Sequence, residues 1–271
     1  MAQISRTEAR RRADRPNPQK KQAKEVSAPT SVLDSATGPG ELTFLKGVLF
    51  GPPKSGKTSA AASRPKTLVL LTEPEGDLPL RGRKGIDVVR PENWGEMASV
   101  IRDLATTHKG KWETLVFDSV SMAFEVIGGK DIFKMLSDGR DVRQAYQRAG
   151  SAMNQLIFDA VRLPMNVVFV CQLKHEEEQD DGTALDPELG EHNLTMAVTP
   201  MVYKTLTPAV SFIGRTYQKK VYEDGKPKSE YWVSFNDFGR SPAGSRIPLP
   251  EQVQDLTMDK LLAAMKPNEG S

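Results

Sequence analysis

The stretch FGPPKSGKTS, residues 50–59, decides the fold that this sequence predicts. It fits the pattern GxxxxGK(S/T), in which backbone N–H groups surround the phosphates of a nucleotide and glycines let the chain come close to the anion. We expect Lys57 to reach the β- and γ-phosphates and the Thr58 hydroxyl to coordinate Mg²⁺, which prefers oxygen ligands. The predicted nucleotide-binding residues are Gly51, Pro52, Pro53, Lys54, Ser55, Gly56, Lys57, Thr58 and Ser59.

The sequence on either side of this stretch supports the same interpretation. A phosphate-binding loop of this type follows a strand and opens a helix. Residues 43–50 are mostly apolar and predict a buried strand, and residues 58–62 have short side chains compatible with a helix. The alternative is a Gly/Pro/Ser turn that matches the pattern by chance.

Further apolar segments predict a sheet around this loop. Four apolar strands that alternate with helices favour a parallel sheet covered on both faces. The sequence therefore predicts an α/β fold with a mainly parallel central sheet. The expected strands after the first are residues 66–71, 86–89, 114–119 and 166–172, and the expected helices are residues 93–107 and 151–163.

Two regions depart from this alternation. After residue 119 we expect a helix that breaks near Gly128 and Gly129, followed by a loop as far as Arg143. Towards the C-terminus we expect antiparallel strands added at one side of the sheet and then a short helix. These strands are residues 210–215, 219–222 and 230–235, with a turn at 223–226, and the helix is residues 256–265.

Composition limits the class of protein. A chain of 271 residues can bury a large core and would usually form one large domain with appendages. No apolar run approaches the roughly 20 residues of a membrane span, and the first residues lack the apolar part of a secretory signal. The single cysteine, Cys171, fits a reducing compartment. We expect a cytoplasmic protein with no membrane contact.

The charge is unevenly distributed along the chain. Residues 1–24 contain eight Lys or Arg and two acids, in a segment without apolar periodicity. This composition predicts a disordered basic arm at residues 1–40, which either contacts nucleic acid or only aids solubility. The remaining predicted regions are a core at residues 41–250 and a C-terminal helix and tail at residues 251–271.

Three polar positions at predicted strand ends complete a candidate catalytic site. Asp118 is placed to organise Mg²⁺, because such an acid usually ends a buried strand near the loop. Glu73 and Glu75 are candidates for orienting or deprotonating the attacking water. Gln172 could sense the γ-phosphate and transmit its presence to the following loop.

The order of these elements resembles the RecA-like recombinase ATPase core. The residues that carry the resemblance are the loop at 51–59, Glu-x-Glu-Gly at 73–76, Asp118-Ser119 and Gln172, within residues 43–250. The chain looks most similar to compact phage-encoded nucleotide-binding proteins that act in single-strand annealing and recombination. The resemblance implies that Glu75 and Lys57 are catalytic, that Asp118 is linked to Mg²⁺, and that Gln172 couples nucleotide to DNA.

The resemblance also implies a function. We expect an ATP- and Mg²⁺-dependent phage recombination protein that binds single-stranded DNA and promotes annealing or strand pairing. Its expected partners are other copies of itself, in a ring or filament, and a phage or host single-strand-binding protein. An ATP-driven motor or helicase loader remains an alternative, and so does a non-catalytic nucleotide switch that recruits protein partners.

The sequence does not decide which residues would bind DNA. The family places a DNA-binding loop after Gln172, but residues 174–191 contain eight acids and one lysine, which phosphates would repel. DNA contacts could come instead from residues 199–204 or from the basic arm. A third candidate region contains Arg140, Arg143 and Arg148, and a neighbouring subunit could supply Arg240 or Arg246 to the ATP site.

Overall fold

The computed structural model describes residues 43–175, 194–223, 225–237 and 241–265. The predicted arm at residues 1–40, most of the acidic segment and Arg240 lie outside the described residues. Among those that are described, no helix has the length and apolar character needed to cross a membrane.

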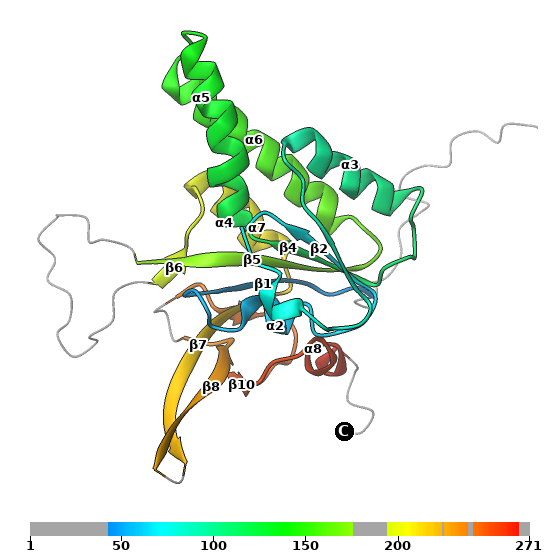
Figure 1. The fold of residues 1–271 in the computed structure, drawn as a ribbon, viewed down its shortest axis with the longest axis vertical. Coiled ribbons are helices and arrows are strands. Elements are labelled where there is room, and N and C mark those ends of the chain that lie inside the picture. The colour runs from blue at the N-terminus through cyan, green and yellow to red at the C-terminus, as the bar shows by residue number, and fades with distance from the viewer. Residues whose placement is uncertain (1–42, 176–193, 224, 238–240, 266–271) are drawn as a thin grey trace, which may run out of the picture. The chain divides into compact units, whose positions relative to one another are not determined.

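Five parallel strands form the centre of the sheet, in the order β3–β2–β4–β5–β1 (Figure 1). Since the strands are parallel, their carboxyl ends meet at one edge, where ligands bind in open α/β sheets. The interior strands β1, β2 and β4 are buried almost throughout. These strands are β1 (Lys46–Gly51), β2 (Thr67–Leu71), β3 (Ile86–Val89), β4 (Thr114–Asp118) and β5 (Asn166–His175).

The other side of β1 carries the later strands. β7 (Phe212–Glu223) pairs parallel with β1 and antiparallel with β8 (Lys226–Ser234), so the sheet changes character at β7. β8 in turn pairs antiparallel with β10 (Gln252–Gln254). The predicted fold class is confirmed: an α/β fold with a mainly parallel sheet and antiparallel strands towards the C-terminus. Two short strands, β6 (Leu194–Met196) and β9 (Gly244–Ser245), pair with β5 and β7.

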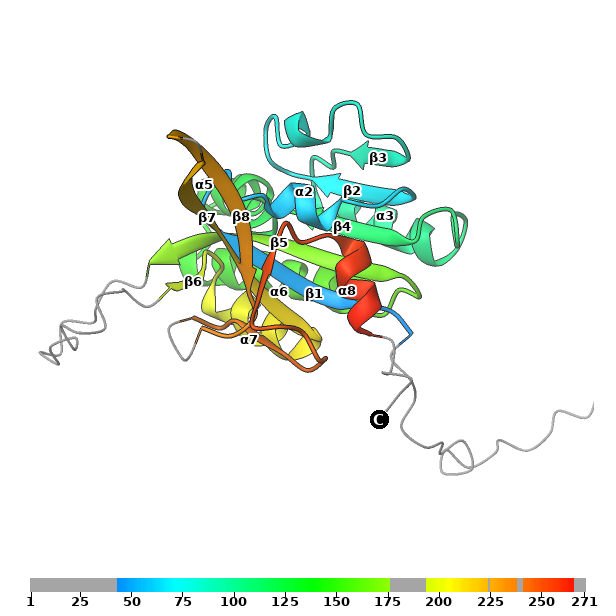
Figure 2. The same ribbon diagram turned by 90° about the horizontal axis from the view of Figure 1, so that it is seen from below.

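Helices cover both faces of the sheet. Along β1, Val48 and Phe50 point into the core beneath α3 (Trp94–Ala105) and α6 (Val142–Val161), while Leu49 belongs to the core on the opposite face. The opposite core includes α2 (Lys57–Ala61) and α8 (Met258–Ala264), and Figure 2 shows both helices on the face turned to the viewer. β1 is therefore buried from both sides, which places the loop after it on a rigid support.

The helix break predicted near Gly128 and Gly129 was wrong, and so was the loop predicted from there to Arg143, because α5 occupies most of that region. α4 (Val120–Ala123), a π-helical turn (Phe124–Gly128) and α5 (Gly129–Ser137) form one continuous helical segment, with φ near −60° at both glycines. Glycine destabilises a helix because it loses much conformational entropy there. Packing offsets this cost: α5 buries Ile132 and Met135 against Ala145 and Ala149 of α6.

Two helical starts were also missed. α6 begins at Val142, where the Asp141 side chain accepts hydrogen bonds from two backbone N–H groups. α7 (Pro200–Ala209) begins with Pro200 and is capped by the Thr199 side chain. A capping residue followed by proline is a helix-start signal, so the Thr-Pro pair could have identified α7 from the sequence.

Candidate active site

The phosphate-binding loop joins β1 to α2 as predicted. At Gly51 a Cβ atom would lie 2.2 Å from Thr216 Oγ1, so only glycine fits against β7. Gly56 has a φ of 87°, in the left-handed region that favours glycine. The Ser55 hydroxyl lies 2.8 Å from the Pro52 carbonyl oxygen and 2.5 Å from Thr216 Oγ1. The loop is thus held on one side by a strand that lies far away in the sequence.

Lys57 is folded back onto the loop. Its Nζ donates hydrogen bonds to the carbonyl oxygens of Gly51 (2.9 Å) and Pro52 (2.8 Å) and lies 3.4 Å from Gln172 Oε1. Burial lowers the pKa of the Lys57 ammonium, although the carboxylates of Glu73 and Asp118 act in the opposite direction. An anion in the loop would offer this ammonium stronger, charge-assisted hydrogen bonds than the two carbonyl oxygens do.

Asp118 and Thr58 form a donor set for a hard cation. Thr58 Oγ1 donates to Asp118 Oδ2 over 2.5 Å, while Asp118 Oδ1 is buried without a hydrogen-bond partner among the described residues. Burial raises the pKa of Asp118 from 3.8 to about 6, and the Thr58 hydrogen bond offsets this only in part. A buried carboxylate oxygen without a partner is costly. Mg²⁺ fits this pair because it takes oxygen ligands and would compensate the carboxylate charge.

Glu73 lies in the same network. Gln172 Nε2 donates to Glu73 Oε1 over 2.5 Å, and Ser119 Oγ donates to the same oxygen over 2.8 Å. Because Gln172 also contacts Lys57, side chains join the ends of β1, β2 and β4 to the neighbouring position in β5. The structure therefore brings Gln172 together with the loop, as predicted, although Gln172 does not end its strand: β5 continues to His175, and Gln172 pairs with Gly51 at the end of β1.

Glu75 lies in a different environment. It is exposed and has a φ of 56°, in a turn after Glu73. Both acids line a cavity of about 450 Å³ together with the loop, Asp118 and Gln172. Among the described residues, the carboxylate of Glu73 forms side-chain hydrogen bonds and that of Glu75 forms none. The catalytic role predicted for Glu75 stays a prediction.

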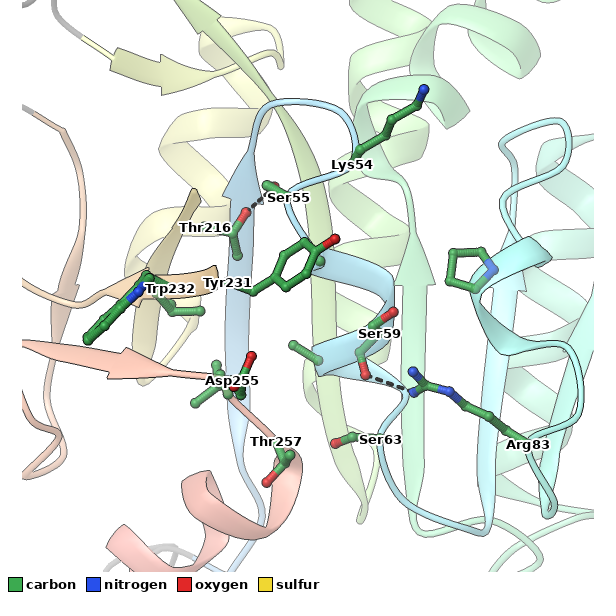
Figure 3. Close-up of a pocket in the computed structure, with 15 residues that line it drawn as sticks. Lys54, Ser55, Ser59, Ser63, Arg83, Thr216, Tyr231, Trp232, Asp255 and Thr257 are labelled. Atoms are coloured by element: carbon green, nitrogen blue, oxygen red, sulfur yellow. Dashed lines mark hydrogen bonds between the residues drawn. The ribbon is translucent and has the colours of Figure 1, made fainter. Parts of the chain in front are cut away.

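A second cavity of about 590 Å³ adjoins the first and shares residues 54–56, Ser59 and Pro79 with it. Figure 3 shows the residues that line it. The Tyr231 ring lies beside Gly56, with Cδ1 3.1 Å from the position that a Cβ would take. Arg83 Nη1 donates to the Ser59 carbonyl oxygen over 3.0 Å. Sequence reasoning missed this cavity, because long-range strand pairing brings Tyr231 to the loop and no local motif marks it.

The other predicted functional residues lie apart from this network. Arg140, Arg143 and Arg148 are exposed on α6 and the segment before it, and Arg246 is exposed after β9. Within the described ranges, no hydrogen bond or salt bridge joins these side chains to the loop, Asp118 or the acids after β2. Their predicted contacts with DNA or with a neighbouring subunit stay predictions.

Comparison with known proteins identifies the family to which this chain belongs. The AAA_24 family, described as an AAA domain, matches residues 43–247, which include every loop and strand-end residue described above. A comparison with curated proteins gave no match. Two solved structures resemble the chain, each with a TM-score of 0.39: the RadB recombinase (15% identity, covering 75% of this chain and 86% of that chain) and the flagellar accessory protein FlaH from Methanocaldococcus jannaschii (12% identity, 82% and 89%). This chain belongs to the AAA_24 family of AAA domains and has an α/β fold with a mainly parallel sheet.

Proposed function

We propose that this protein binds ATP with Mg²⁺, hydrolyses the ATP, and couples this cycle to annealing or pairing of single-stranded DNA. The observation that carries the proposal is the convergence of Lys57, Thr58, Asp118, Glu73 and Gln172 where β1, β2 and β4 end beside β5. P-loop folds serve many reactions. These side chains, more than the fold, therefore support the proposed activity.

Lys57 and the loop would hold the phosphates. In exchanging its two loop carbonyl partners for phosphate oxygens, the Lys57 ammonium would gain charged acceptors in a water-poor site. Thr58 and Asp118 would hold Mg²⁺, which supplies charge neutralisation at the β- and γ-phosphates. The buried Asp118 Oδ1 would then gain the partner that it lacks.

Glu73 is the better-placed general base. Two donors, Gln172 Nε2 and Ser119 Oγ, hold its Oε1 and fix the direction of the carboxylate. Its Oε2 is then left to orient a water molecule and accept its proton. Because Gln172 contacts both Glu73 and Lys57, it is positioned to respond to the phosphates and to relay their presence along β5.

The second cavity suits the nucleoside. It adjoins the loop at Gly56, and the Tyr231 ring offers an apolar face on which a base could stack. Arg83, Ser63 and Thr257 also line this cavity and could supply polar contacts (Figure 3). Together the two adjoining cavities would give room for a triphosphate in the first and a nucleoside in the second.

The DNA part of the proposal is supported by the resemblance of the motif order to recombinases. The same resemblance supports head-to-tail assembly of copies of the chain and a single-strand-binding protein, of phage or host, as partner. The exposed side chain of Arg246 would then be available to a neighbouring ATP site.

The test combines binding and turnover measurements. Lys57→Gln should abolish binding of a fluorescent ATP analogue in the presence of Mg²⁺, whereas Lys84→Gln, which removes an exposed lysine, should bind as the wild type does. Phosphate release should be measurable, and single-stranded DNA should stimulate it. A labelled pair of complementary strands should anneal faster with the protein and ATP than without them.

Three alternative results would each contradict a different part of the proposal. Tight ATP binding with no turnover and no DNA affinity would point to a nucleotide switch that recruits proteins. Strand separation driven by ATP would point to a motor. Unchanged nucleotide binding by Lys57→Gln would show that the loop does not hold the phosphates.

A further inference from the structure

The strands β7 and β8 form a two-stranded ribbon that extends beyond the rest of the sheet (Figure 1). In its register, Tyr217 lies opposite Trp232, Gln218 opposite Tyr231, and Lys219 opposite Glu230. Side chains of successive residues point to opposite faces of a strand. We call the face with Thr216, Gln218 and Tyr231 the inner face, and the face with Tyr217, Lys219 and Trp232 the outer face.

The inner face is attached to the phosphate-binding loop. Gln218 Nε2 donates to the Lys54 carbonyl oxygen over 2.5 Å, and Thr216 Oγ1 lies 2.5 Å from Ser55 Oγ. The Tyr231 ring packs beside Gly56, as described above. Three consecutive loop residues, 54–56, therefore contact this ribbon, and a ligand that moves the loop also acts on the ribbon.

The outer face combines aromatic rings with an available lysine. Lys219 Nζ lies 4.3 Å from the ring centroid of Trp232 and 5.6 Å from that of Tyr217. Lys219 is exposed and forms no salt bridge with any residue in the described ranges. Glu230, its cross-strand neighbour, accepts a hydrogen bond from Trp232 Nε1 over 3.0 Å. The ammonium is thus held over rings and is free to pair with an incoming anion.

The ribbon continues with the same residue types towards its tip. Lys220 and Tyr222 lie on the inner face, on the part of the ribbon beyond the loop. Both are exposed there, and Tyr222 is 78% exposed, a large fraction for an aromatic side chain. Residues 215–234 contain five basic and three acidic residues, so the ribbon is positive overall. Not every basic residue is available: Lys228 is paired with Glu223 over 2.6 Å.

Lysines interleaved with exposed aromatic rings suit one ligand class. Single-stranded nucleic acid offers phosphates for the lysines and unpaired bases for the rings, and stacking on aromatic side chains needs no specific sequence. In a duplex the bases stack on one another and leave no free face for the rings. We propose that the part of the β7–β8 ribbon beyond the loop, with Lys219 on its outer face and Lys220 and Tyr222 on its inner face, is a binding site for single-stranded nucleic acid.

This inference rests on the proposed function for its ligand class and adds the surface that binds it. The nucleic acid would contact the part of the ribbon beyond the loop, while the nucleotide contacts the loop against which the inner face packs. Because the loop and the ribbon share these contacts, nucleotide and nucleic acid should alter each other's affinity by the same factor.

The experiment is fluorescence anisotropy of a labelled oligothymidylate of about 20 nucleotides, long enough for one site, with the full chain at several salt concentrations. The variants are Lys219→Gln/Lys220→Gln and Tyr222→Ala. The matched control is Lys109→Gln/Lys111→Gln, which removes the same charge from exposed positions, where Lys111 Nζ likewise lies 4.2 Å from the Trp112 ring centroid.

The ribbon pair should lower the slope of log K against log salt by about 1.4, since each lost phosphate contact on a single strand counts about 0.7. Tyr222→Ala should weaken binding about tenfold, in line with the loss of one stacked base. The control pair should change the slope much less. A duplex of the same length should bind the wild type more weakly than the single strand does.

Equal losses in the ribbon pair and the control pair, or unchanged binding by the ribbon variants, would overturn this inference and leave the proposed function standing. Equal affinity for duplex and single strand would exclude the stacking contact. If the wild type binds ATP but no oligonucleotide in either nucleotide state, the DNA part of the proposed function fails as well. Retained binding of the ATP analogue by each variant shows that its fold is intact.

Discussion

Asp118→Asn tests whether the carboxylate at the end of β4 is held in the site at a cost to stability. Burial raises the pKa of Asp118 from 3.8 to about 6 in the folded chain without metal. An acid whose pKa is raised on folding favours the native state below its unfolded pKa, and this contribution is lost as the pH rises through the folded pKa. A pKa difference of one between the two states corresponds to about 1.4 kcal/mol, so the ionised carboxylate should cost about 3 kcal/mol well above pH 6.

The variant carries no charge at this position and should escape this cost at every pH. Compared with wild type, Asp118→Asn should therefore gain roughly 1 to 2 kcal/mol of unfolding free energy between about pH 5 and about pH 8. The measurement is urea unfolding of both proteins across this range in a buffer with a chelator. A change with pH is the informative quantity, because any hydrogen bond that the amide gains or loses is independent of pH.

Asp138→Asn is the matched control, because it removes a carboxylate from an exposed position. Its free energy of unfolding relative to wild type should stay nearly constant over the same range. A stability difference between Asp118→Asn and wild type that is also constant with pH would refute the reasoning, since the carboxylate would then be as well solvated in the native chain as in the unfolded one.

Three further substitutions separate the roles assigned to neighbouring residues. Glu73→Gln should lower the rate of ATP turnover by about 100-fold, whereas Glu75→Gln should retain most of it; the reverse order would restore the sequence-based assignment. Gly51→Ala should lower the free energy of unfolding by about 1–3 kcal/mol in chemical denaturation, because its Cβ would lie 2.2 Å from Thr216 Oγ1. Gln218→Ala removes one hydrogen bond between the ribbon and the loop. It should reduce the ATP-dependent change in oligonucleotide affinity by about threefold, as the loss of one hydrogen bond would. If ATP changes the oligonucleotide affinity of this variant as much as that of the wild type in the anisotropy assay, the ribbon does not respond to the loop.

Sequence reasoning succeeded where a local pattern determines the structure. The spacing of Gly51, Gly56 and Lys57 marks a strand–loop–helix unit, and parallel strands must bring their carboxyl ends to one edge. These two facts are enough to predict that Asp118 and Gln172 lie near the loop. Their hydrogen bonds to Thr58 and Glu73 confirm that placement.

Reasoning from the sequence was limited where distant segments decide the outcome. Thr216 and Tyr231 contact the loop from positions more than 150 residues away, and only the pairing of β7 with β1 and β8 brings them there. The break expected at the two glycines after residue 127 failed because packing between α5 and α6 outweighs local propensity. Glu73 and Glu75 are two residues apart, and the turn between them, which no pattern encodes, decides which one meets Gln172.

The alternation of faces along the β7–β8 ribbon limits how this segment can change in length. Inserting or deleting one residue in one strand would turn every following side chain to the opposite face. A ring now beside Gly56 would then point away from it, and Lys219 would move from the rings of Tyr217 and Trp232 to the other face. Length variation in natural relatives of this chain should therefore occur at the tip of the ribbon, or as two-residue steps within its strands.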